Sequence, residues 1–290
     1  MSSNSEEREP LQFMAVMAHP HDFTHVIGLL GIHRALGDAV VLVSITDGAS
    51  THNEALEDEC LKPLDERDPA LTSPEARIDY SRQKEEELQK AAALFGITDV
   101  HVLQGKQPFV AKDSQDVLTD LEKLILQYRP DVMITQSPHL YYHESTHHKM
   151  AIQPEDDHLE TAQAVMIAGR MAGEPNPERN AILHRTALTL YPGVYYPMDE
   201  WDFVIDVSDF YLRRVKAESM FKSQGQTDAF AARRVEVVVG NHGWFHGVPY
   251  GEGYVCAQRQ VWKELPISPM TLARTRQTSA EKMNMIALDK

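Results

Sequence analysis

The stretch Phe13-Met14-Ala15-Val16-Met17-Ala18-His19-Pro20-His21-Asp22 decides the fold. Its apolar run, stopped by proline, is typical of a buried strand in a parallel sheet. Open α/β sheets bind ligands beyond the carboxyl ends of such strands. His19 and Asp22 follow at that end, and imidazole with carboxylate is a ligand mix of zinc and its first-row neighbours. The stretch indicates a metal site, against the alternative of an ordinary turn in which Asp22 caps a helix and the histidines are solvated.

Composition narrows the class of protein. The 290 residues suit one large α/β domain or two small ones, and the net charge of −15 argues against nucleic acid or an anionic membrane as main partner. Two cysteines cannot build a disulfide framework and suit a reducing compartment. The first ten residues resemble no secretory signal, and no stretch reaches the ~18 apolar residues of a membrane span. We therefore expect a cytoplasmic protein with a small-molecule substrate, and a homo-oligomer is possible.

The first half of the chain alternates strands and helices. Beyond the opening strand, apolar and β-branched runs predict strands at Val40–Ile45, Val100–Leu103 and Asp131–Thr135. Helical spacing predicts helices at Phe23–Leu36, Arg77–Phe95 and Val117–Tyr128. This β-α-β-α-β-α-β pattern predicts a doubly wound, mainly parallel Rossmann-like sheet with helices on both faces, of the α/β class. In the strand order 3-2-1-4 the first and fourth strands are neighbours.

The second half is less regular. Further strands are expected at Thr186–Tyr191, Phe203–Val207 and Tyr254–Trp262, and helices at Leu159–Met171, from Ser208 as N-cap to about Ser223, and at Phe230–Val239. Residues 49–75 read as a long polar loop: a lid, a binding loop or a disordered stretch. Residues 241–253 are either a pocket wall or a surface turn. We expect a disordered leader over residues 1–10, a single domain over 11–263 and a mobile tail over 264–290.

A third metal ligand is expected from the middle of the chain. Asp157 is the candidate cap of the helix after the fourth strand, which puts His158 in the first turn of that helix. The adjacency of the first and fourth strands then brings His158 to His19 and Asp22. Three protein ligands and an open position are typical of catalytic zinc, whereas structural zinc usually has four.

A competing metal motif lies nearby. His143-Glu144-Ser145-Thr146-His147 matches the H-E-x-x-H pattern of zinc proteases, which works because a helix sets both histidines on one face. The flanks carry no helical apolar stripe, and prolines bracket the segment, so we disfavour this interpretation. Asp47, in Thr46-Asp47-Gly48 at the end of the second strand, is either a substrate-binding candidate or an ordinary turn residue before glycine.

Five motifs in register resemble the LmbE-like, or PIG-L, zinc-dependent N-deacetylases. The family's A-H-P-[D]-[D]-E is matched by Ala18-His19-Pro20-His21-Asp22-Phe23, and its T-[DN]-G by Thr46-Asp47-Gly48. The remaining matches are Ala91-Ala92-Ala93-Leu94-Phe95-Gly96, Arg129-Pro130-Asp131-Val132-Met133-Ile134-Thr135 and Glu155-Asp156-Asp157-His158. The resemblance runs from about residue 13 to residue 172 and is weaker to about residue 250.

The resemblance implies a metal site of His19, Asp22 and His158. It also reveals departures: the family's general-base aspartate is His21 here, its following glutamate is Phe23, and its oxyanion-stabilising histidine is Glu155. An imidazole suits base catalysis near neutral pH, so His21 is our candidate base, with a fourth-ligand role or a purely structural role as alternatives. The oxyanion or leaving-group function is open among the polar residues that follow the fourth strand, namely His139, His143, His147, His148 and Glu155.

We therefore expect a hydrolase dependent on zinc or another first-row divalent metal, which cleaves an amide bond of a small, sugar-like N-acyl substrate. Our candidates are His21, Glu155 and His147 for catalysis, and Asp47, His139 and His143 for substrate binding. Two alternatives remain open: a lyase, isomerase or other C–N or C–O bond-cleaving enzyme that uses the same metal, and a family member that binds a ligand without turnover.

Overall fold

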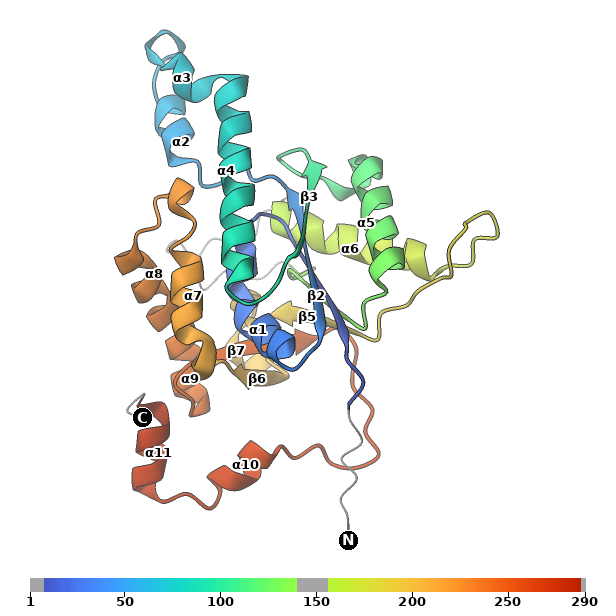
Figure 1. The fold of residues 1–290 in the computed structure, drawn as a ribbon, viewed down its shortest axis with the longest axis vertical. Helices are drawn as coiled ribbons and strands as arrows, with labels where there is room; N and C mark the ends of the chain where they lie inside the picture. Colours follow the sequence, from blue (N-terminus) through green and yellow to red (C-terminus); the bar gives the residue numbers. More distant parts are fainter. Residues whose placement is uncertain (1–7, 140–155, 288–290) are drawn as a thin grey trace.

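Seven strands form one mixed sheet in the order β3-β2-β1-β4-β5-β7-β6 (Figure 1). The computed structural model describes residues 8–139 and 156–287. Within them the strands are β1 Gln12–Met17, β2 Ala39–Thr46, β3 Asp99–Gly105, β4 Val132–Thr135, β5 Leu188–Pro192, β6 Phe203–Asp206 and β7 Gly251–Cys256. The β1, β2, β3, β4 and β5 strands pair in parallel, whereas β7 runs antiparallel to both β5 and β6. The predicted α/β class, and the expected order of the first four strands, are confirmed.

Helices cover both faces of the sheet. Their bounds are α1 Ile27–Ala35, α2 Glu54–Cys60, α3 Pro69–Thr72, α4 Pro74–Ala93, α5 Gln115–Tyr128, α6 Asp157–Gly173, α7 Tyr211–Glu218, α8 Asp228–Val235, α9 Asn241–His246, α10 Pro269–Arg274 and α11 Ser279–Ile286. Side chains of β1 alternate between the two faces, because successive residues of a strand point in opposite directions. Phe13 and Met17 pack with α1 and α4, while Met14 and Val16 pack with α5 and α6.

The second half corrects two predictions. Ser208 does not cap a helix: its hydroxyl donates to Asp206 Oδ1 at 2.5 Å, and α7 begins only at Tyr211. The Ser208 oxygen accepts instead from Tyr250 N at 3.1 Å, so it binds the residue before β7 and not the first turn of a helix. The last strand is Gly251–Cys256, ahead of the expected Tyr254–Trp262. Beyond Cys256 the side chain of Gln258 accepts from Thr189 N at 2.7 Å, so the backbone pairing with β5 ends there.

Two segments expected to lack regular structure contain short helices. Side-chain caps start the helices of residues 49–75: Asn53 accepts from Leu56 N for α2, and Asp68 accepts from Ala70 N for α3. The tail contains α10 and α11, and α11 starts with a capping box formed by Thr278 and Glu281. Residues 241–246 form α9, which ends at Gly247 with a φ of +71°, a conformation that glycine adopts without strain.

Among the described residues, we find no helix that combines the length and the apolar character needed to cross a membrane. The segment that holds His143-Glu144-Ser145-Thr146-His147, together with Glu155, lies outside the described residues.

Candidate metal centre

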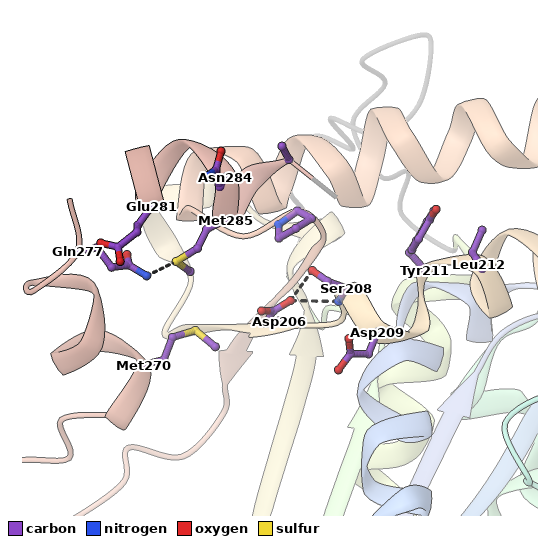
Figure 2. Close-up of a pocket in the computed structure, with 12 residues that line it drawn as sticks. Asp206, Ser208, Asp209, Tyr211, Leu212, Met270, Gln277, Glu281, Asn284 and Met285 are labelled. Carbon is purple, nitrogen blue, oxygen red and sulfur yellow. Dashed lines mark hydrogen bonds between the residues drawn. The ribbon is translucent and has the colours of Figure 1, made fainter. Parts of the chain in front are cut away.

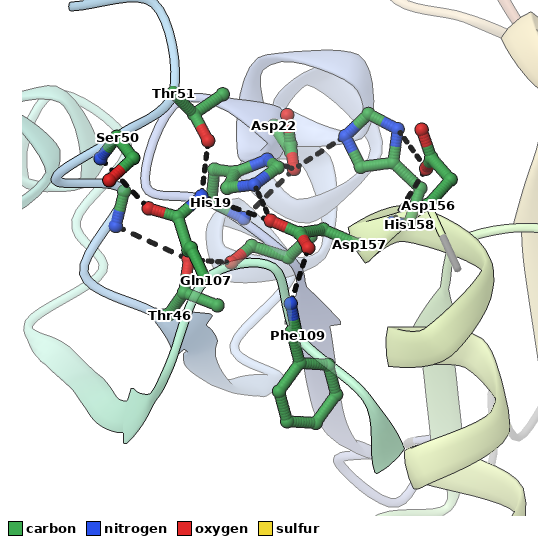
Figure 3. A network of polar contacts seen from close by, with 12 residues as sticks. His19, Asp22, Thr46, Ser50, Thr51, Gln107, Phe109, Asp156, Asp157 and His158 are labelled. Atoms are coloured by element: carbon green, nitrogen blue, oxygen red, sulfur yellow. Dashed lines mark hydrogen bonds and ion pairs between the residues drawn. The ribbon is translucent and has the colours of Figure 1, made fainter. Parts of the chain in front are cut away.

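Three predicted metal ligands meet at the carboxyl edge of the sheet (Figure 3). His19, Asp22 and His158 each offer one ligand atom, and these atoms lie within 4.8 Å of one another. His19 Nδ1 is 3.3 Å from Asp22 Oδ2, and His158 Nε2 is 3.4 Å from the same oxygen. A single cation could contact all three, because the nitrogens flank one carboxylate oxygen.

Topology explains why residues so distant in sequence converge. β1 leads directly into His19, and Asp22 starts a short 3-10 helix, Asp22–His25. β4 lies beside β1 in parallel, so the chain that leaves β4 returns to the same edge of the sheet. His158 lies in the first turn of α6, which follows β4.

The cap of α6 differs from the prediction. Asp156 is the N-cap, and its Oδ1 accepts a hydrogen bond from His158 N at 2.8 Å. Asp157 is instead the first residue of the helix, where its carboxylate is free to turn toward β1. The shift of one position arises because either aspartate can cap, and only the packing of the helix against β1 selects between them.

Asp157 orients His19. His19 Nε2 lies 2.9 Å from Asp157 Oδ2, so the ring donates its Nε2 proton there and presents Nδ1 to the ligand group. The same carboxylate accepts from Gln107 Nε2 at 2.9 Å and from Phe109 N at 2.6 Å. Sequence reasoning missed this supporting role. The signal available was that an acidic residue directly precedes the third ligand.

A second polar residue missed from sequence holds Asp22. Gln136, the first residue after β4, donates from Nε2 to Asp22 Oδ2 at 2.8 Å and accepts from Ala18 N at 3.0 Å through Oε1. The backbone N–H of His19 donates to Asp22 Oδ2 at 2.9 Å. Asp22 is thus held between β1 and β4. Gln136 could have been found from the sequence, because a polar residue directly after a central strand lies at the edge of the sheet where ligands bind.

The donor set fits a divalent metal of the zinc type. His19 Nδ1 is buried and makes no hydrogen bond within the described part of the chain, which is unfavourable for a ring nitrogen unless a ligand occupies it. Burial lowers the pKa of His19, but Asp22 and Asp157 outweigh burial and raise this pKa to about 9. In the metal-free protein a proton therefore occupies the position that a metal would take, so metal and proton compete for the site.

His21 stands beside the metal group and is only 6% exposed. Its Nε2 lies 3.1 Å from Asp22 Oδ1, which leaves Nδ1 buried without a hydrogen bond to any described residue. Burial lowers the pKa of His21 well below its usual value, and nearby Lys84, His52 and His19 act in the same direction against Asp22. His21 is therefore a neutral imidazole with a nitrogen available to accept a proton.

Two further groups near the site were missed. Lys84, on α4, is fully buried, and its Nζ donates to Gly48 O at 2.9 Å and to Thr51 O at 2.5 Å. Tyr195 is buried with its ring centroid 5.9 Å from that of His158. Burial, reinforced by Asp22, raises the pKa of Tyr195 well above its usual value, so its hydroxyl keeps its proton.

The remaining predicted residues lie in different surroundings. Asp47 accepts from Ala49 N and from Ser81 Oγ, both at 2.9 Å, so its two oxygens hold a turn and α4 together. His139 packs at 6.4 Å from Tyr196, centroid to centroid, and lines a pocket of about 500 Å³. The candidates Glu155, His147 and His143 lie outside the described residues.

Comparisons with known proteins agree with this architecture. The family model described as PIG-L, GlcNAc-PI de-N-acetylase, matches residues 14–168. The structure is similar to N,N'-diacetylchitobiose deacetylase from Pyrococcus horikoshii (TM-score 0.66, 18% identity, 86% of this chain and 84% of that chain covered). It is also similar to GalB, the 4-carboxy-2-hydroxymuconate hydratase from Pseudomonas putida KT2440 (TM-score 0.66, 16% identity, 88% and 100% covered). No curated protein matches the sequence.

The family match spans more than half of the chain and includes all three candidate metal ligands. Identities this low to the solved structures establish the fold and leave the chemistry to the site itself. On the strength of the family match, this chain belongs to the PIG-L family.

Proposed function

We propose that the protein is a metal-dependent hydrolase that cleaves an amide bond of a small, sugar-like N-acyl substrate. The observation that carries this proposal is the buried group of His19, Asp22 and His158, with the neutral imidazole of His21 beside it. Membership of a family described by a de-N-acetylase supports the same reaction class. Zinc is the metal we propose, because two imidazoles and one carboxylate are typical of catalytic zinc sites.

Each residue has a defined task in this proposal. His19 and His158, with Asp22 between them, hold the metal, and Asp157 keeps His19 in the tautomer that presents Nδ1. A bound metal would polarise the amide carbonyl and make water more acidic. His21 accepts the proton of the attacking water at Nδ1 and then passes it to the departing amine.

The test is turnover on a panel of N-acetylated sugars by zinc-loaded protein, read as acetate and primary amine released in equal amounts. We expect release with at least one N-acyl compound. If only a ligand-binding role existed, the zinc-loaded protein would bind panel members without releasing acetate, and the hydrolase proposal would fail.

A specific observation also supports a second candidate, a metal-dependent hydratase or lyase. The position of the family's general-base aspartate holds His21, which changes the proton-handling group while the metal ligands remain. The similar structure of GalB is that of a hydratase, so the scaffold supports addition of water to a substrate other than an amide. Incubation with unsaturated carboxylic acids would show this activity as loss of ultraviolet absorbance without release of an amine.

We further propose that the catalytic domain spans residues 11–263 and that the protein acts in the cytoplasm. Cys60 and Cys256 are free thiols, and Cys60 is exposed, which suits a reducing compartment. Labelling of Cys60 by a membrane-permeant thiol reagent in intact cells, compared with a Cys60→Ser control, tests the compartment. Protection of Cys60 by oxidation would contradict it.

A further inference from the structure

Two segments that expose apolar side chains lie at opposite ends of the molecule (Figure 1). One is the helical tip, residues 54–79, which contains α2, α3 and the start of α4. The other is the tail loop, residues 259–267, between β7 and α10. They lie toward opposite ends of the longest axis of the molecule, so the tail loop of one chain lies far from the helical tip of the same chain.

The helical tip exposes large apolar side chains on a rigid frame. Leu61 is 82% exposed and Leu64 is 81% exposed, and Leu71 and Ile78 are exposed on the neighbouring helices. The frame is held from within by the buried carboxylate of Glu59, which accepts from Lys62 Nζ at 2.6 Å and from Asp68 N at 2.8 Å. A tip with internal bonds of this kind presents its leucines in one arrangement instead of collapsing over them.

The tail loop has the same property. Val261 is 96% exposed and Leu265 is 84% exposed, with Trp262 and Ile267 exposed between and after them. The loop is anchored on both sides, because Ala257 N donates to Thr189 O at 2.9 Å before it and Arg274 Nη2 donates to Gly247 O at 3.1 Å after it. The apolar side chains are thus held out in solvent by a segment whose two ends are tied to the domain.

Beyond the tail loop, the chain returns to the body. Figure 2 shows α11 beside the junction of β6 and α7, where Met270 and Met285 line a pocket of about 920 Å³ together with Asp206 and Tyr211. Met285 is half-buried there, and its sulfur contacts Gln277. The end of the tail therefore lines a pocket on the body, although Leu272 and Met283 on it are exposed like the apolar side chains of the tail loop.

The two segments are complementary in charge. Residues 54–79 carry nine Asp or Glu against three Lys or Arg, whereas the tail loop, residues 259–267, carries two Lys or Arg against one Glu. Apolar patches with opposite charge around them attract one another and align on contact. On a chain with a net charge of −15, the acidic helical tip is repelled by acidic parts of another copy, whereas the tail loop, with more basic than acidic residues, attracts it.

We propose that the tail loop of one copy docks on the helical tip of a second copy, with Trp262 and Leu265 packed against Leu61 and Leu64. Because the two surfaces differ, the contact is head-to-tail, and its repetition gives a ring where the rotation between copies closes and a filament where it does not. The docked loop would contact the segment that begins directly after Asn53, close to the loop that carries Thr51 beside Gln107. Assembly would therefore brace the loop at the edge of the metal centre.

Sedimentation of the full chain tests this proposal. Wild type is expected to sediment well above its monomer mass of 32.8 kDa. Trp262→Asp with Leu265→Asp removes the tail surface, and Leu61→Lys with Leu64→Lys removes the tip surface. Each double variant is expected to weaken association at least about tenfold. The matched control is Ile182→Lys, at an equally exposed apolar position outside both segments, and it should assemble like wild type.

Mixing the two double variants separates this contact from others. Each retains the surface that the other lacks, so an equimolar mixture should form a dimer although neither variant associates alone. A wild-type monomer at about 100 µM would overturn the proposal, since a specific contact of ordinary affinity is populated at that concentration. So would association of the tip variant alone, which indicates a tail-to-tail contact, or a mixture that stays monomeric. Circular dichroism of each variant confirms that it is folded, because all altered side chains are exposed.

Discussion

His19 and Asp157 share a hydrogen bond of 2.9 Å between Nε2 and Oδ2, although 138 positions separate them in the sequence. The bond connects the turn after β1 to the first residue of α6. It makes the orientation of a ring in the candidate ligand group depend on a carboxylate that is not itself a member of that group. The candidate metal centre therefore consists of three candidate ligands and of the residues that hold them in place, and both sets can be tested.

Asp157, which orients His19, can be tested by Asp157→Asn. The amide cannot support the same charge-assisted bond, so His19 loses its preference for presenting Nδ1, and zinc affinity should fall about 10- to 100-fold. Competition with a chromogenic chelator measures this. Asp116→Asn is the control, because Asp116 also lies in the first turn of a helix but is exposed and is not a member of the candidate ligand group. Unchanged zinc affinity in Asp157→Asn would contradict the orienting role.

The candidate ligand group itself can be tested by His158→Ala. Purified wild type should contain about one metal ion per chain, and the variant should contain far less, because one of three ligands is gone. Metal analysis by mass spectrometry gives the ratio. His139→Ala is the matched control, since His139 follows the same strand but packs against Tyr196. Full metal content in His158→Ala would remove this residue from the centre.

His21→Asn separates catalysis from metal binding. The variant should retain its metal, because His21 is not a member of the ligand group, while kcat falls about 10²- to 10⁴-fold through loss of the base. Asp22→Ala should lose both metal and activity. If His21→Asn instead lost its metal, the imidazole would be a fourth ligand, and the base role would be wrong.

The buried Lys84 should make the stability of the protein depend on pH. Burial lowers the pKa of Lys84 from 10.5 to about 8, although nearby carboxylates oppose the shift. Between these two pH values the unfolded chain binds more protons than the folded one, so this residue makes the free energy of unfolding rise with pH. The rise is up to about 3 kcal/mol, because each unit of pKa corresponds to about 1.4 kcal/mol.

Urea unfolding at several pH values from about 8 to 10.5 measures this contribution as the difference between wild type and Lys84→Met. The difference should change across the window in favour of wild type. Lys90→Met, at an exposed position of the same helix, is the control and should leave the pH dependence unchanged. A difference that stays constant with pH would show that Lys84 has an ordinary pKa.

Substitution of the buried Glu252, which lies outside the candidate ligand group, should lower stability strongly. Its buried carboxylate accepts from Gly28 N at 3.0 Å and Leu29 N at 2.9 Å at the start of α1, and pairs with Arg214 Nη1 at 2.6 Å. Glu252→Gln leaves Arg214 buried with reduced compensation, so the free energy of unfolding should fall by about 3 kcal/mol. Chemical denaturation measures it, with the exposed Glu264→Gln as control. A loss below about 0.5 kcal/mol would contradict this account.

The sequence by itself determined the architecture of the first half. The apolar run before His19 and the alternation of strands and helices predicted a parallel sheet with helices on both faces, and both are observed. These features are local, because apolar periodicity follows directly from the geometry of each element. The same logic placed His19, Asp22 and His158 at one edge, since parallel strands end on the same side.

The sequence was less informative where no periodicity guides the chain. Side-chain caps such as Asn53 and Thr278 create short helices in segments that lack an apolar stripe, and Ser208 bonds to Asp206 instead of capping. A choice between two possible caps, Asp156 or Asp157, costs little energy locally. Contact with β1 decides it, and that contact is absent from any pattern in the sequence.

Only the tertiary structure decided which groups support the metal centre. Gln136 holds Asp22, Asp157 orients His19, and Lys84 lies buried beneath the turn at Gly48. Residue type and spacing can predict a candidate metal ligand, because coordination chemistry restricts the side chains that can bind a metal. A supporting residue needs only one hydrogen bond in the right place, which many side chains can make. Its identity therefore emerges from the three-dimensional packing of elements far apart in the chain.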